Sequence, residues 1–443
     1  MSPTSPHILL VNPWIHDFAA YDVWASPLGL LGLAAILRES GFKVTYYDCL
    51  NRFHPRGGQS PNPNRCGRGP YEKTELPKPP GLDDIPRRYC RYGVKLEWFE
   101  EDLKALPAPD LILVTSIMTY WYPGVADTIG RLRRQWPWTT IVLGGIYATL
   151  CRDHAVAHSG ADRVVSGFTG RDIVHLAAEE TGWTPLAVHW SNANLDAYPL
   201  PAFDLQTRIP FVALLSSVGC PFSCDYCASP LLSPGRWIQS PGRVESEIRH
   251  WHHRHGVIDF AFYDDALLAD DAHALPLLDR LARMPETIRF HTPNALHIRA
   301  VTSQIATLLK RAGFQTVRLG LETTGRRMLD RKTSIEQFEA AVEHLKAAGF
   351  GKDELGAYLL VGLPNQPIGE IEEAILRVKQ MGVRPIPAYF TPIPGTKLWG
   401  EAVRSSRYDL DSDPVFTNNT LLPCRRAPYS WDVVKRIRRW LSE

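Results

Sequence analysis

The sequence predicts an α/β protein with two domains, a Rossmann-like doubly wound parallel sheet followed by a partial, TIM-like (β/α)6 barrel. Three observations carry this prediction. Short apolar runs alternate with helical patterns over residues 1–185, and six further strand–helix units occupy residues 211–400. A proline-marked linker at residues 186–210 separates the two series. Residues 401–443 then form a C-terminal covering segment that ends in a helix.

The strands of the first domain are expected to be short, apolar and separated by helices. This order is typical of a parallel sheet whose ligand binds at the carboxyl ends of the strands. A helix is expected over Pro27–Ser40, where apolar residues recur at helical spacing before Gly41, and another from Tyr122 to about Trp136. The expected strands are His7–Asn12, Lys43–Asp48, Leu111–Ser116, Thr140–Gly145 and Asp162–Val165.

Residues 51–92 interrupt this alternation. The stretch is rich in Pro, Gly and Arg and has no hydrophobic period, so we expect a long loop. Because it leaves the carboxyl end of a strand, it is predicted to cover the ligand site as a lid. Cys66 and Cys90 fit either an auxiliary iron–sulfur cluster or, as we favour, two free thiols.

The second domain is expected to be an open barrel, because six β/α units are too few for a closed eight-stranded one. The expected strands are Phe211–Ser216, Asp259–Tyr263, Arg289–Thr292, Thr316–Leu321, Gly356–Val361 and Pro387–Phe390. The expected helices are Val244–His255, Ala274–Met284, Ser303–Ala312, Ile335–Ala348 and Glu370–Met381. In the C-terminal helix an apolar face is expected to dock on the body, opposite a solvated basic face. The apolar residues are Val433, Val434, Ile437, Trp440 and Leu441, and the basic ones are Lys435, Arg436, Arg438 and Arg439.

Cys220, Cys224 and Cys227 are the most informative residues of the chain. Their C-x3-C-x2-C spacing lies in one short loop after the first barrel strand, at the edge where β/α barrels keep their active sites. Three thiolates can bind a four-iron cluster and leave its fourth iron without a protein ligand. The next cysteine, Cys424, is far along the chain. The spacing therefore predicts a 4Fe-4S cluster with one open iron, where chemistry can take place.

A zinc knuckle is the alternative for this loop. Zinc prefers four tetrahedral ligands, and four histidines follow the cysteines in sequence. These histidines end an expected helix just before Gly256, where basic residues are common because of the helix dipole. We therefore favour the iron–sulfur cluster. The four histidines are His250, His252, His253 and His255.

This cysteine spacing with an aromatic residue before the last cysteine, here Tyr226, resembles the radical S-adenosylmethionine (radical SAM) superfamily. The resemblance implies that the three cysteines hold the cluster, that S-adenosylmethionine (SAM) chelates the open iron, and that Tyr226 lies beside the adenine. It also implies cleavage of SAM to a 5′-deoxyadenosyl radical, which abstracts hydrogen from an unactivated carbon. An external one-electron reductant, such as a flavodoxin or ferredoxin, would supply the electron.

Further positions that resemble the superfamily lie at the ends of later barrel strands. Asp264 and Asp265 stand where family members often bind the methionine amine, and their Asp-Asp form resembles the branch with an N-terminal cobalamin-type domain. An N-cap or surface pair is the alternative for them. Glu322 is implied to accept hydrogen bonds from the ribose hydroxyls. Arg318, on the same side of its strand, either contacts SAM or is a structural ion-pair partner. Gly362 resembles the fifth-strand glycine element near the adenine.

The first domain resembles the N-terminal domain of cobalamin-binding radical SAM proteins. Its glycines let the backbone approach a bulky ligand, and hydroxyls at a strand end could bond the nucleotide tail. The D-x-H-x-x-G motif of many cobalamin proteins is absent, so no histidine is assigned as a cobalt ligand. The alternative is a Rossmann-like domain that has lost its cofactor and holds substrate or a partner. The residues that carry the resemblance are Gly29, Thr115, Ser116, Gly144 and Gly145.

Charge and composition limit the classes of partner that the sequence predicts. A net charge of +2 gives no global electrostatic footprint for nucleic acid. The sequence has no apolar run of about 18 residues that would predict a membrane span, and no signal-peptide pattern at its start. Scattered cysteines suit a reducing compartment. The chain is therefore expected to be cytoplasmic, without nucleic-acid or membrane partners.

Together these features predict a cobalamin-dependent radical SAM methyltransferase that acts on an unactivated carbon of an unidentified small molecule or peptide. One alternative is a non-methylating radical SAM enzyme that forms a ring or rearranges its substrate. Another is a metal-binding scaffold without catalysis. The aromatic run Met118–Tyr122 fits the lining of a substrate or corrin pocket and equally fits packing between the domains.

Overall fold

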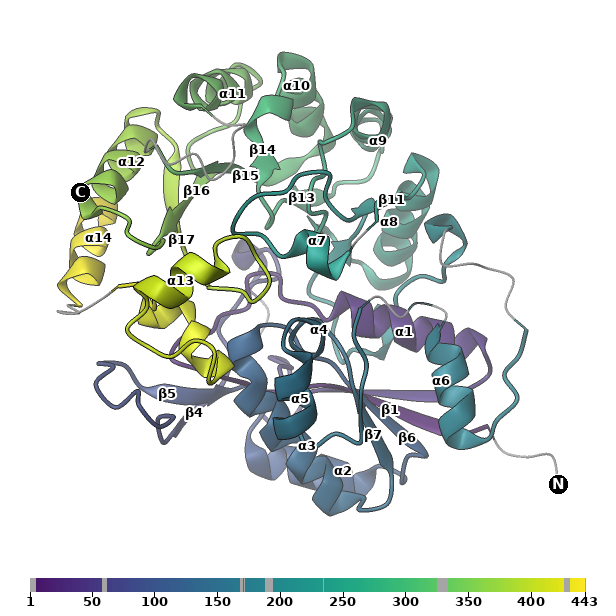
Figure 1. Ribbon diagram of the computed structural model, residues 1–443. Helices are drawn as coiled ribbons and strands as arrows, with labels where there is room; N and C mark the ends of the chain where they lie inside the picture. Colours follow the sequence, from purple (N-terminus) through teal and green to yellow (C-terminus); the bar gives the residue numbers. More distant parts are fainter. Residues whose placement is uncertain are drawn as a thin grey trace. The chain divides into compact units, whose positions relative to one another are not determined.

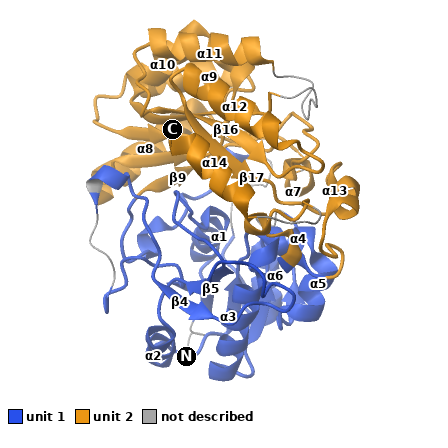
Figure 2. Cartoon of the chain, turned by 90° about the vertical axis from the view of Figure 1, so that its left-hand side faces the viewer, with its two compact units in different colours: residues 1–210, 413–415 blue, residues 211–412, 416–443 orange. Residues whose placement is uncertain are grey.

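The computed structural model describes residues 5–57, 62–167, 170, 172–187, 194–233, 235–324, 334–425 and 431–442. The chain divides into two compact units (Figure 2). The first is Met1–Pro210 with Asp413–Val415, and the second is Phe211–Ser412 with Phe416–Glu443. Each unit has its own parallel sheet. No helix in the described ranges is both long and apolar enough to cross a membrane.

The first unit is built on a five-stranded sheet whose neighbouring strands are all parallel (Figure 1). In spatial order the strands are β3 (Lys43–Asp48), β1 (His7–Asn12), β6 (Leu111–Val114), β7 (Thr140–Leu143) and β8 (Arg163–Val164). In chain order this is 2-1-3-4-5, a doubly wound arrangement in which the strand order reverses between β1 and β6. The predicted strands are confirmed, although β6 and β7 end two residues before the predicted limits.

Helices cover both faces of this sheet, because alternate residues of each strand point to opposite sides. Ile8 and Leu10 of β1 belong to a core with α1 and α6, whereas Leu9 and Val11 belong to a core with α2 and α3. The helices are α1 (Leu28–Glu39), α2 (Leu96–Ala105), α3 (Tyr122–Gln135), α4 (Ile146–Leu150), α5 (Arg152–His158) and α6 (Asp172–Thr181). The two-sided core is the physical reason that β1 is apolar at every position from 8 to 11.

The described residues of the stretch 51–92, which are 51–57 and 62–92, include regular structure that we did not expect in a long loop. They contribute two strands to a small antiparallel sheet, in which β5 (Tyr89–Tyr92) lies between β2 (Ile15–Asp17) and β4 (Lys73–Leu76). These strands have three or four residues each, too few for a period of two to stand out in the sequence. A buried ion pair of 2.8 Å between Arg52 and Asp22 ties the start of the segment to the body of the unit.

The second unit is an open parallel barrel of six β/α units, as predicted, with its helices on the outside (Figure 1). The strands follow each other in space as in the chain: β9 (Val212–Leu214), β12 (Asp259–Phe262), β13 (Arg289–His291), β15 (Phe314–Glu322), β16 (Leu355–Val361) and β17 (Arg384–Tyr389). A short strand, β14 (Leu296–His297), also pairs with β15. The helices are α8 (Pro241–His255), α9 (Asp271–Ala282), α10 (Ser303–Ala312), α11 (Ile335–Ala347) and α12 (Ile368–Gln380).

Caps fix the ends of the barrel helices. At the start of α8 the Ser240 side chain accepts a hydrogen bond from the backbone N–H of Arg243. Gly256 ends this helix in the left-handed conformation, at φ +67°. The expectation that Gly256 stops the histidine-rich helix is therefore confirmed.

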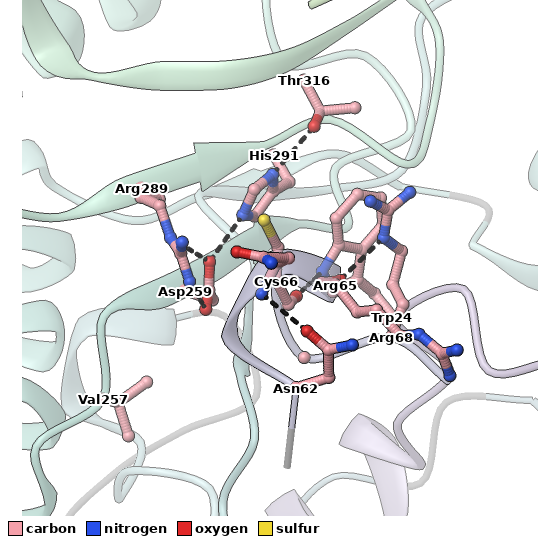
Figure 3. A network of polar contacts seen from close by, with 12 residues as sticks. Trp24, Asn62, Arg65, Cys66, Arg68, Val257, Asp259, Arg289, His291 and Thr316 are labelled. Atoms are coloured by element: carbon pink, nitrogen blue, oxygen red, sulfur yellow. Dashed lines mark hydrogen bonds and ion pairs between the residues drawn. The ribbon is translucent and has the colours of Figure 1, made fainter. Parts of the chain in front are cut away.

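A buried polar network joins three neighbouring strands of the barrel (Figure 3). His291 is fully buried, with its Nε2 at 3.0 Å from Asp259 Oδ1 and its Nδ1 at 3.0 Å from Thr316 Oγ1. Arg289 Nε donates to Asp259 Oδ1 at 2.7 Å. Asp259 and Arg289 begin β12 and β13, and Thr316 is near the start of β15, whereas His291 is the last residue of the short β13. The network therefore ties the three strands together.

The C-terminal helix packs on the second unit as predicted. α14 (Asp432–Ser442) buries Val433, Val434, Ile437 and Trp440 and exposes Lys435, Arg436, Arg438 and Arg439. Lys379 Nζ of α12 donates to the carbonyl oxygen of Trp440 at 2.8 Å. A fully buried tryptophan contributes several kcal/mol of packing, about 3–5 kcal/mol by its removal, so this helix is part of the body of the unit.

Candidate active site

The three cysteines lie in one loop at the carboxyl end of the first barrel strand. The loop leaves β9 through a short strand, β10 (Ser217–Val218), and runs into α7 (Ser229–Leu232). β10 pairs with β11 (Trp237–Ile238), which fixes the base of the loop. Cys220, Cys224 and Cys227 are half-buried, and none of the three is in a disulfide.

Gly219 makes the entry to this loop. Its φ is +83°, and a Cβ at this position would lie 2.1 Å from the carbonyl oxygen of Gly235. A side chain is excluded both by the left-handed backbone and by this close approach. Glycine is therefore required immediately before the first cysteine.

Backbone N–H groups point at two of the sulfur atoms. Phe222 N lies 3.5 Å from Cys220 Sγ, and Ser229 N lies 3.4 Å from Cys227 Sγ. The Ser229 hydroxyl oxygen is also 3.4 Å from Cys227 Sγ. Hydrogen bonds to sulfur stabilise the charge of a thiolate and help to set the potential of iron–sulfur clusters. Three thiols in one loop, two of them with backbone donors at the sulfur, fit the ligand set of an iron–sulfur cluster.

A lysine that follows the last barrel strand holds the loop from outside. Lys397 Nζ donates to the carbonyl oxygen of Ser223 at 2.9 Å and to Asp225 Oδ1 at 3.1 Å. The backbone N–H of Leu398 donates to the carbonyl oxygen of Asp225 at 3.0 Å. The middle of the cysteine loop is thus fixed by a segment about 170 residues away in sequence.

Tyr226 and Glu322, which were predicted from separate motifs, come together. The Tyr226 hydroxyl donates a hydrogen bond to the Glu322 carboxylate. Burial raises the pKa of Tyr226, and the adjacent charge of Glu322 raises it further, so the phenol stays protonated and remains a donor. The Tyr226 ring packs on an apolar cluster that includes Leu360 and Leu363 of the fifth strand and its loop.

Glu322 ends β15 in a strained backbone conformation. Its φ is +65°, and the pairing of β15 with β16 shifts register between Gly320 and Glu322. A Cβ on Gly320 would lie 2.9 Å from Glu322 Oε1, so the missing side chain at 320 leaves room for the carboxylate. Non-glycine residues keep such a conformation only where the surroundings fix it, which is common at ligand sites. The carboxylate is therefore presented at the carboxyl edge of the barrel.

Asp264 and Asp265 have different environments. Asp264 is only 2% exposed, and its carboxylate accepts hydrogen bonds from Ser216 N at 3.0 Å, Ser216 Oγ at 2.6 Å and Ser217 Oγ at 2.7 Å. Burial raises the pKa of Asp264, and these hydrogen bonds oppose the rise. Asp264 thus positions the strand end that leads to the cysteines. Asp265 is exposed, with its carboxylate within hydrogen-bonding reach of the Ser229 side chain, and is the one of the pair that a ligand can reach.

Arg318 and Gly362 are held by internal contacts. Arg318 is 8% exposed, and its Nη1 donates to the carbonyl oxygens of Val317 at 3.2 Å and Glu354 at 3.3 Å. These backbone contacts favour the structural one of its two expected roles. Gly362 has φ +88°, and a Cβ there would lie 2.8 Å from Leu422 Cδ2. Its lack of a side chain therefore lets the C-terminal segment pack on the loop after β16.

The histidines of α8 have their own partners. His252 Nδ1 lies 2.8 Å from the carbonyl oxygen of Val257, within the turn that ends the helix. Across the described parts of the chain, no cluster of three close metal-ligating side chains combines a cysteine of the 220–227 loop with a histidine. Nor does one contain both Cys66 and Cys90 in the same described ranges.

In the first unit, Ser116 and Gly145 join the ends of β6 and β7. The Ser116 hydroxyl donates to the carbonyl oxygen of Gly144 at 2.7 Å, and Ala148 N donates to Ser116 Oγ at 3.3 Å. Gly145 has φ +95°, and a Cβ there would lie 2.3 Å from the carbonyl oxygen of Ser116. Ser116 is 2% exposed. Its hydroxyl makes hydrogen bonds within the protein and does not face a ligand.

The other predicted residues of this unit lie beside open space. Gly29 is exposed in the first turn of α1, where a Cβ would meet no atom within 4 Å. A Cβ on Gly144 would have its nearest neighbour at 3.9 Å, the carbonyl oxygen of Val165. Thr115 is half-buried directly after β6, at the reversal of strand order where doubly wound sheets bind their ligands. These three positions fit the approach of a bulky ligand to the backbone.

Sequence reasoning missed three residues of the site, namely Gly320, Ser229 and Lys397. Gly320 had a usable signal, because an isolated glycine within a strand indicates a bulge or a close approach. Ser229 also had one, since a hydroxyl two residues after a ligand cysteine can reach its sulfur. Lys397 had none, because its contact depends on a distant turn of the chain.

Comparison with known proteins shows which family the barrel is similar to. Residues 214–378 match the family model of the Radical SAM superfamily. An uncharacterised methyltransferase of Pyrococcus horikoshii is 25% identical over 372 residues, which cover 76% of this chain and 76% of that protein. An anaerobic magnesium-protoporphyrin IX monomethyl ester cyclase of Cereibacter sphaeroides is 23% identical over 318 residues, which cover 63% of this chain and 50% of that protein.

Two solved structures share the fold. The radical S-adenosylmethionine methyltransferase TsrM from Kitasatospora setae, with cobalamin and a [4Fe-4S] cluster bound, has a TM-score of 0.65 at 16% identity and covers 90% of this chain and 78% of that chain. The cobalamin-dependent S-adenosylmethionine radical enzyme OxsB has a TM-score of 0.57 at 12% identity and covers 90% of this chain and 55% of that chain. The likeness confirms the predicted fold class, a doubly wound domain followed by a partial barrel.

Proposed function

We propose that this chain is a radical SAM enzyme, and specifically a cobalamin-dependent methyltransferase that acts on an unactivated carbon. The observation that carries the proposal is the union of a three-cysteine loop on an open barrel with a doubly wound domain of 2-1-3-4-5 strand order. The similar proteins support it, since one is named as an uncharacterised methyltransferase, TsrM is a methyltransferase solved with cobalamin bound, and OxsB is described as cobalamin-dependent.

The cysteine loop would hold the cluster. Cys220, Cys224 and Cys227 supply three thiolates, which leaves one iron of a 4Fe-4S cluster for SAM. When bound and reduced by an external one-electron donor, such as a flavodoxin or ferredoxin, this pair of cofactors supplies a radical that abstracts hydrogen from carbon. The loop itself contributes position, because Gly219 and Lys397 fix its two sides.

Three side chains around the loop would bind SAM. The Tyr226 hydroxyl occupies one acceptor position of the Glu322 carboxylate, which leaves further lone pairs of the carboxylate for the ribose hydroxyls. The Tyr226 ring would lie against the adenine. Asp265 would pair with the methionine ammonium, and a charge-assisted hydrogen bond is roughly twice as strong as a neutral one.

The first unit would hold cobalamin at the carboxyl edge of its sheet. Gly29 and Gly144 leave space for the ligand, and Thr115 offers a hydroxyl at the end of β6, next to the strand end that carries Gly144. Ser116 and Gly145 give this edge its shape through their mutual contact. When bound, cobalamin supplies the methyl group. We propose no histidine as its axial ligand, because the sequence lacks the D-x-H-x-x-G motif.

The test begins with the cofactors of protein produced with cobalamin and purified without oxygen. About four irons and four sulfides per chain, together with corrin absorbance bands, are expected. Cys227→Ala should lose the iron, whereas Cys151→Ala, a half-buried cysteine of the first unit, should keep it. One zinc per chain in place of iron would favour the metal-binding scaffold, and protein without corrin bands would count against methyl transfer.

The products decide the reaction type. With a reductant, SAM and a verified substrate, a methyltransferase should form 5′-deoxyadenosine and S-adenosylhomocysteine together. The second candidate is a ring-forming or rearranging enzyme. The 23% sequence identity to the anaerobic magnesium-protoporphyrin IX monomethyl ester cyclase favours it. Such an enzyme would form 5′-deoxyadenosine without S-adenosylhomocysteine, and this result would refute the proposed methylation.

A further inference from the structure

Ser229 lies between the last cysteine and the exposed carboxylate of the site. Its hydroxyl oxygen is 3.4 Å from Cys227 Sγ, and its side chain is within hydrogen-bonding reach of Asp265. The backbone N–H of Ser229 also points at Cys227 Sγ, at 3.4 Å. One residue therefore contacts both a cluster ligand and the carboxylate proposed to bind SAM.

The hydroxyl can serve only one of these two acceptors at a time. A serine hydroxyl has a single proton to donate, and a thiolate bound to iron can only accept. An ionised carboxylate is a strong acceptor. Without a cation at Asp265, the hydroxyl is therefore expected to donate to Asp265, while Cys227 keeps the fixed N–H bond alone.

We propose that Ser229 is a switchable hydrogen-bond donor that couples the binding of SAM at Asp265 to the reduction potential of the cluster. This inference rests on the proposed function. The methionine ammonium would neutralise the charge of the Asp265 carboxylate and so weaken it as an acceptor, which lets the Ser229 hydroxyl donate to Cys227 Sγ instead. The proton stays on the serine oxygen throughout, and the single electron comes from the external reductant.

The direction of the effect follows from charge. Reduction adds negative charge to the cluster, and a hydrogen bond to a ligand sulfur stabilises that charge. The potential should therefore rise when the hydroxyl turns to Cys227. A cluster without SAM would be harder to reduce, so an electron would enter mainly once the reaction partner is in place.

The surroundings favour a change confined to the hydroxyl. Pro230 follows Ser229 at the start of α7 and fixes the backbone there. The other side of the loop is fixed by Lys397. Rotation about one side-chain bond is then sufficient to exchange the two acceptors.

The test is a double-mutant cycle in which the midpoint potential of the cluster is measured. A chemical reductant is titrated in, and electron paramagnetic resonance detects the reduced cluster. Ser229→Ala should leave the potential of SAM-free protein almost unchanged and lower the potential of SAM-bound protein. In an Asp265→Asn background, Ser229→Ala should lower the potential even without SAM, because the neutral amide competes weakly for the hydroxyl. Ser223→Ala is the matched control, since the described contact of Ser223 is made by its backbone carbonyl.

An equal effect of Ser229→Ala in all three states, or no effect in any of them, would overturn the inference. Ser229→Gly is a second hydroxyl-free variant for the case that Ser229→Ala does not assemble a cluster, and Ser229→Thr should behave as wild type. Failure of the proposed function is distinguishable from failure of this inference. The proposed function is refuted if the wild-type protein binds no four-iron cluster or no SAM.

Discussion

Gly320→Ala is the sharpest test of how the site presents Glu322. The new Cβ would lie 2.9 Å from Glu322 Oε1 and 3.3 Å from the Cβ of Ala295. Ordinary contact begins at 3.4 Å, so the carboxylate must move by about half an ångström. The atom that moves is the end of a side chain, and the φ of residue 320 is not in the left-handed region. The fold should therefore accept the methyl group, whereas the carboxylate loses its position.

The size of the effect follows from the bonds that Glu322 would lose. Its backbone is fixed at φ +65°, and one oxygen is held by the Tyr226 hydroxyl, so the carboxylate has little freedom to recover. A hydrogen bond to a charged group contributes about 1.5–3 kcal/mol. Loss of one such bond to the ribose should weaken SAM binding by roughly ten-fold to a hundred-fold.

The assay is equilibrium binding of labelled SAM to cluster-containing protein without oxygen, with thermal unfolding of the same samples as a measure of stability. Gly369→Ala is the matched control, because a Cβ in the first turn of α12 meets no atom within 4 Å. We expect weaker binding for Gly320→Ala alone and wild-type stability for both. Wild-type SAM affinity in a stable Gly320→Ala protein would refute the assignment of Glu322 to the ribose.

Three further changes test other parts of the molecule. Burial raises the pKa of Glu247 from 4.5 to about 7, so its contribution favours the folded state below pH 4.5 and is lost as pH rises towards 7. At about 1.36 kcal/mol per pKa unit, Glu247→Gln should raise the free energy of unfolding by up to about 3 kcal/mol at pH 8 and change it little at pH 4. A denaturation midpoint equal to that of the wild-type protein at pH 8 would contradict this. Gly219→Ala, whose Cβ would meet a carbonyl oxygen at 2.1 Å, should lose most of its bound iron, whereas Gly242→Ala, with open space, should keep it. Trp440→Ala should lower the free energy of unfolding by about 3–5 kcal/mol in urea, against less than about 0.5 kcal/mol for the exposed Arg438→Ala, and similar losses for both would refute docking of α14.

The parts of the fold that sequence predicted are those whose signal is local and repeated. The strands of both units are apolar runs, and the helices between them have apolar residues at helical spacing, as in Ser303–Ala312, where prediction and structure agree at both ends. The end of α8 at Gly256 was likewise predicted, because glycine readily adopts the left-handed conformation that ends a helix. Periodicity and caps are properties of neighbouring residues, so they need no knowledge of the tertiary structure.

The small sheet in residues 51–92 shows where this signal ends. β4 and β5 are short, and their third partner, β2, precedes them by more than fifty residues. Nothing in four residues distinguishes a strand from a loop when its pairing is set from so far away. α2 was missed for a related reason. Its buried side is narrow, with only Phe99 and Leu103 fully inside, so the apolar stripe hardly repeats.

The pair Asp264 and Asp265 shows what separates a motif from a site. The two residues are chemically identical and adjacent, and the sequence assigned them one role together. In the structure Asp264 is buried and Asp265 is exposed. The Asp264 carboxylate accepts hydrogen bonds from Ser216 and Ser217 and stabilises the end of the strand. Asp265 remains exposed, with Ser229 beside it. The chemistry of the motif therefore depends on which carboxylate stays exposed to a ligand, and only packing decides that.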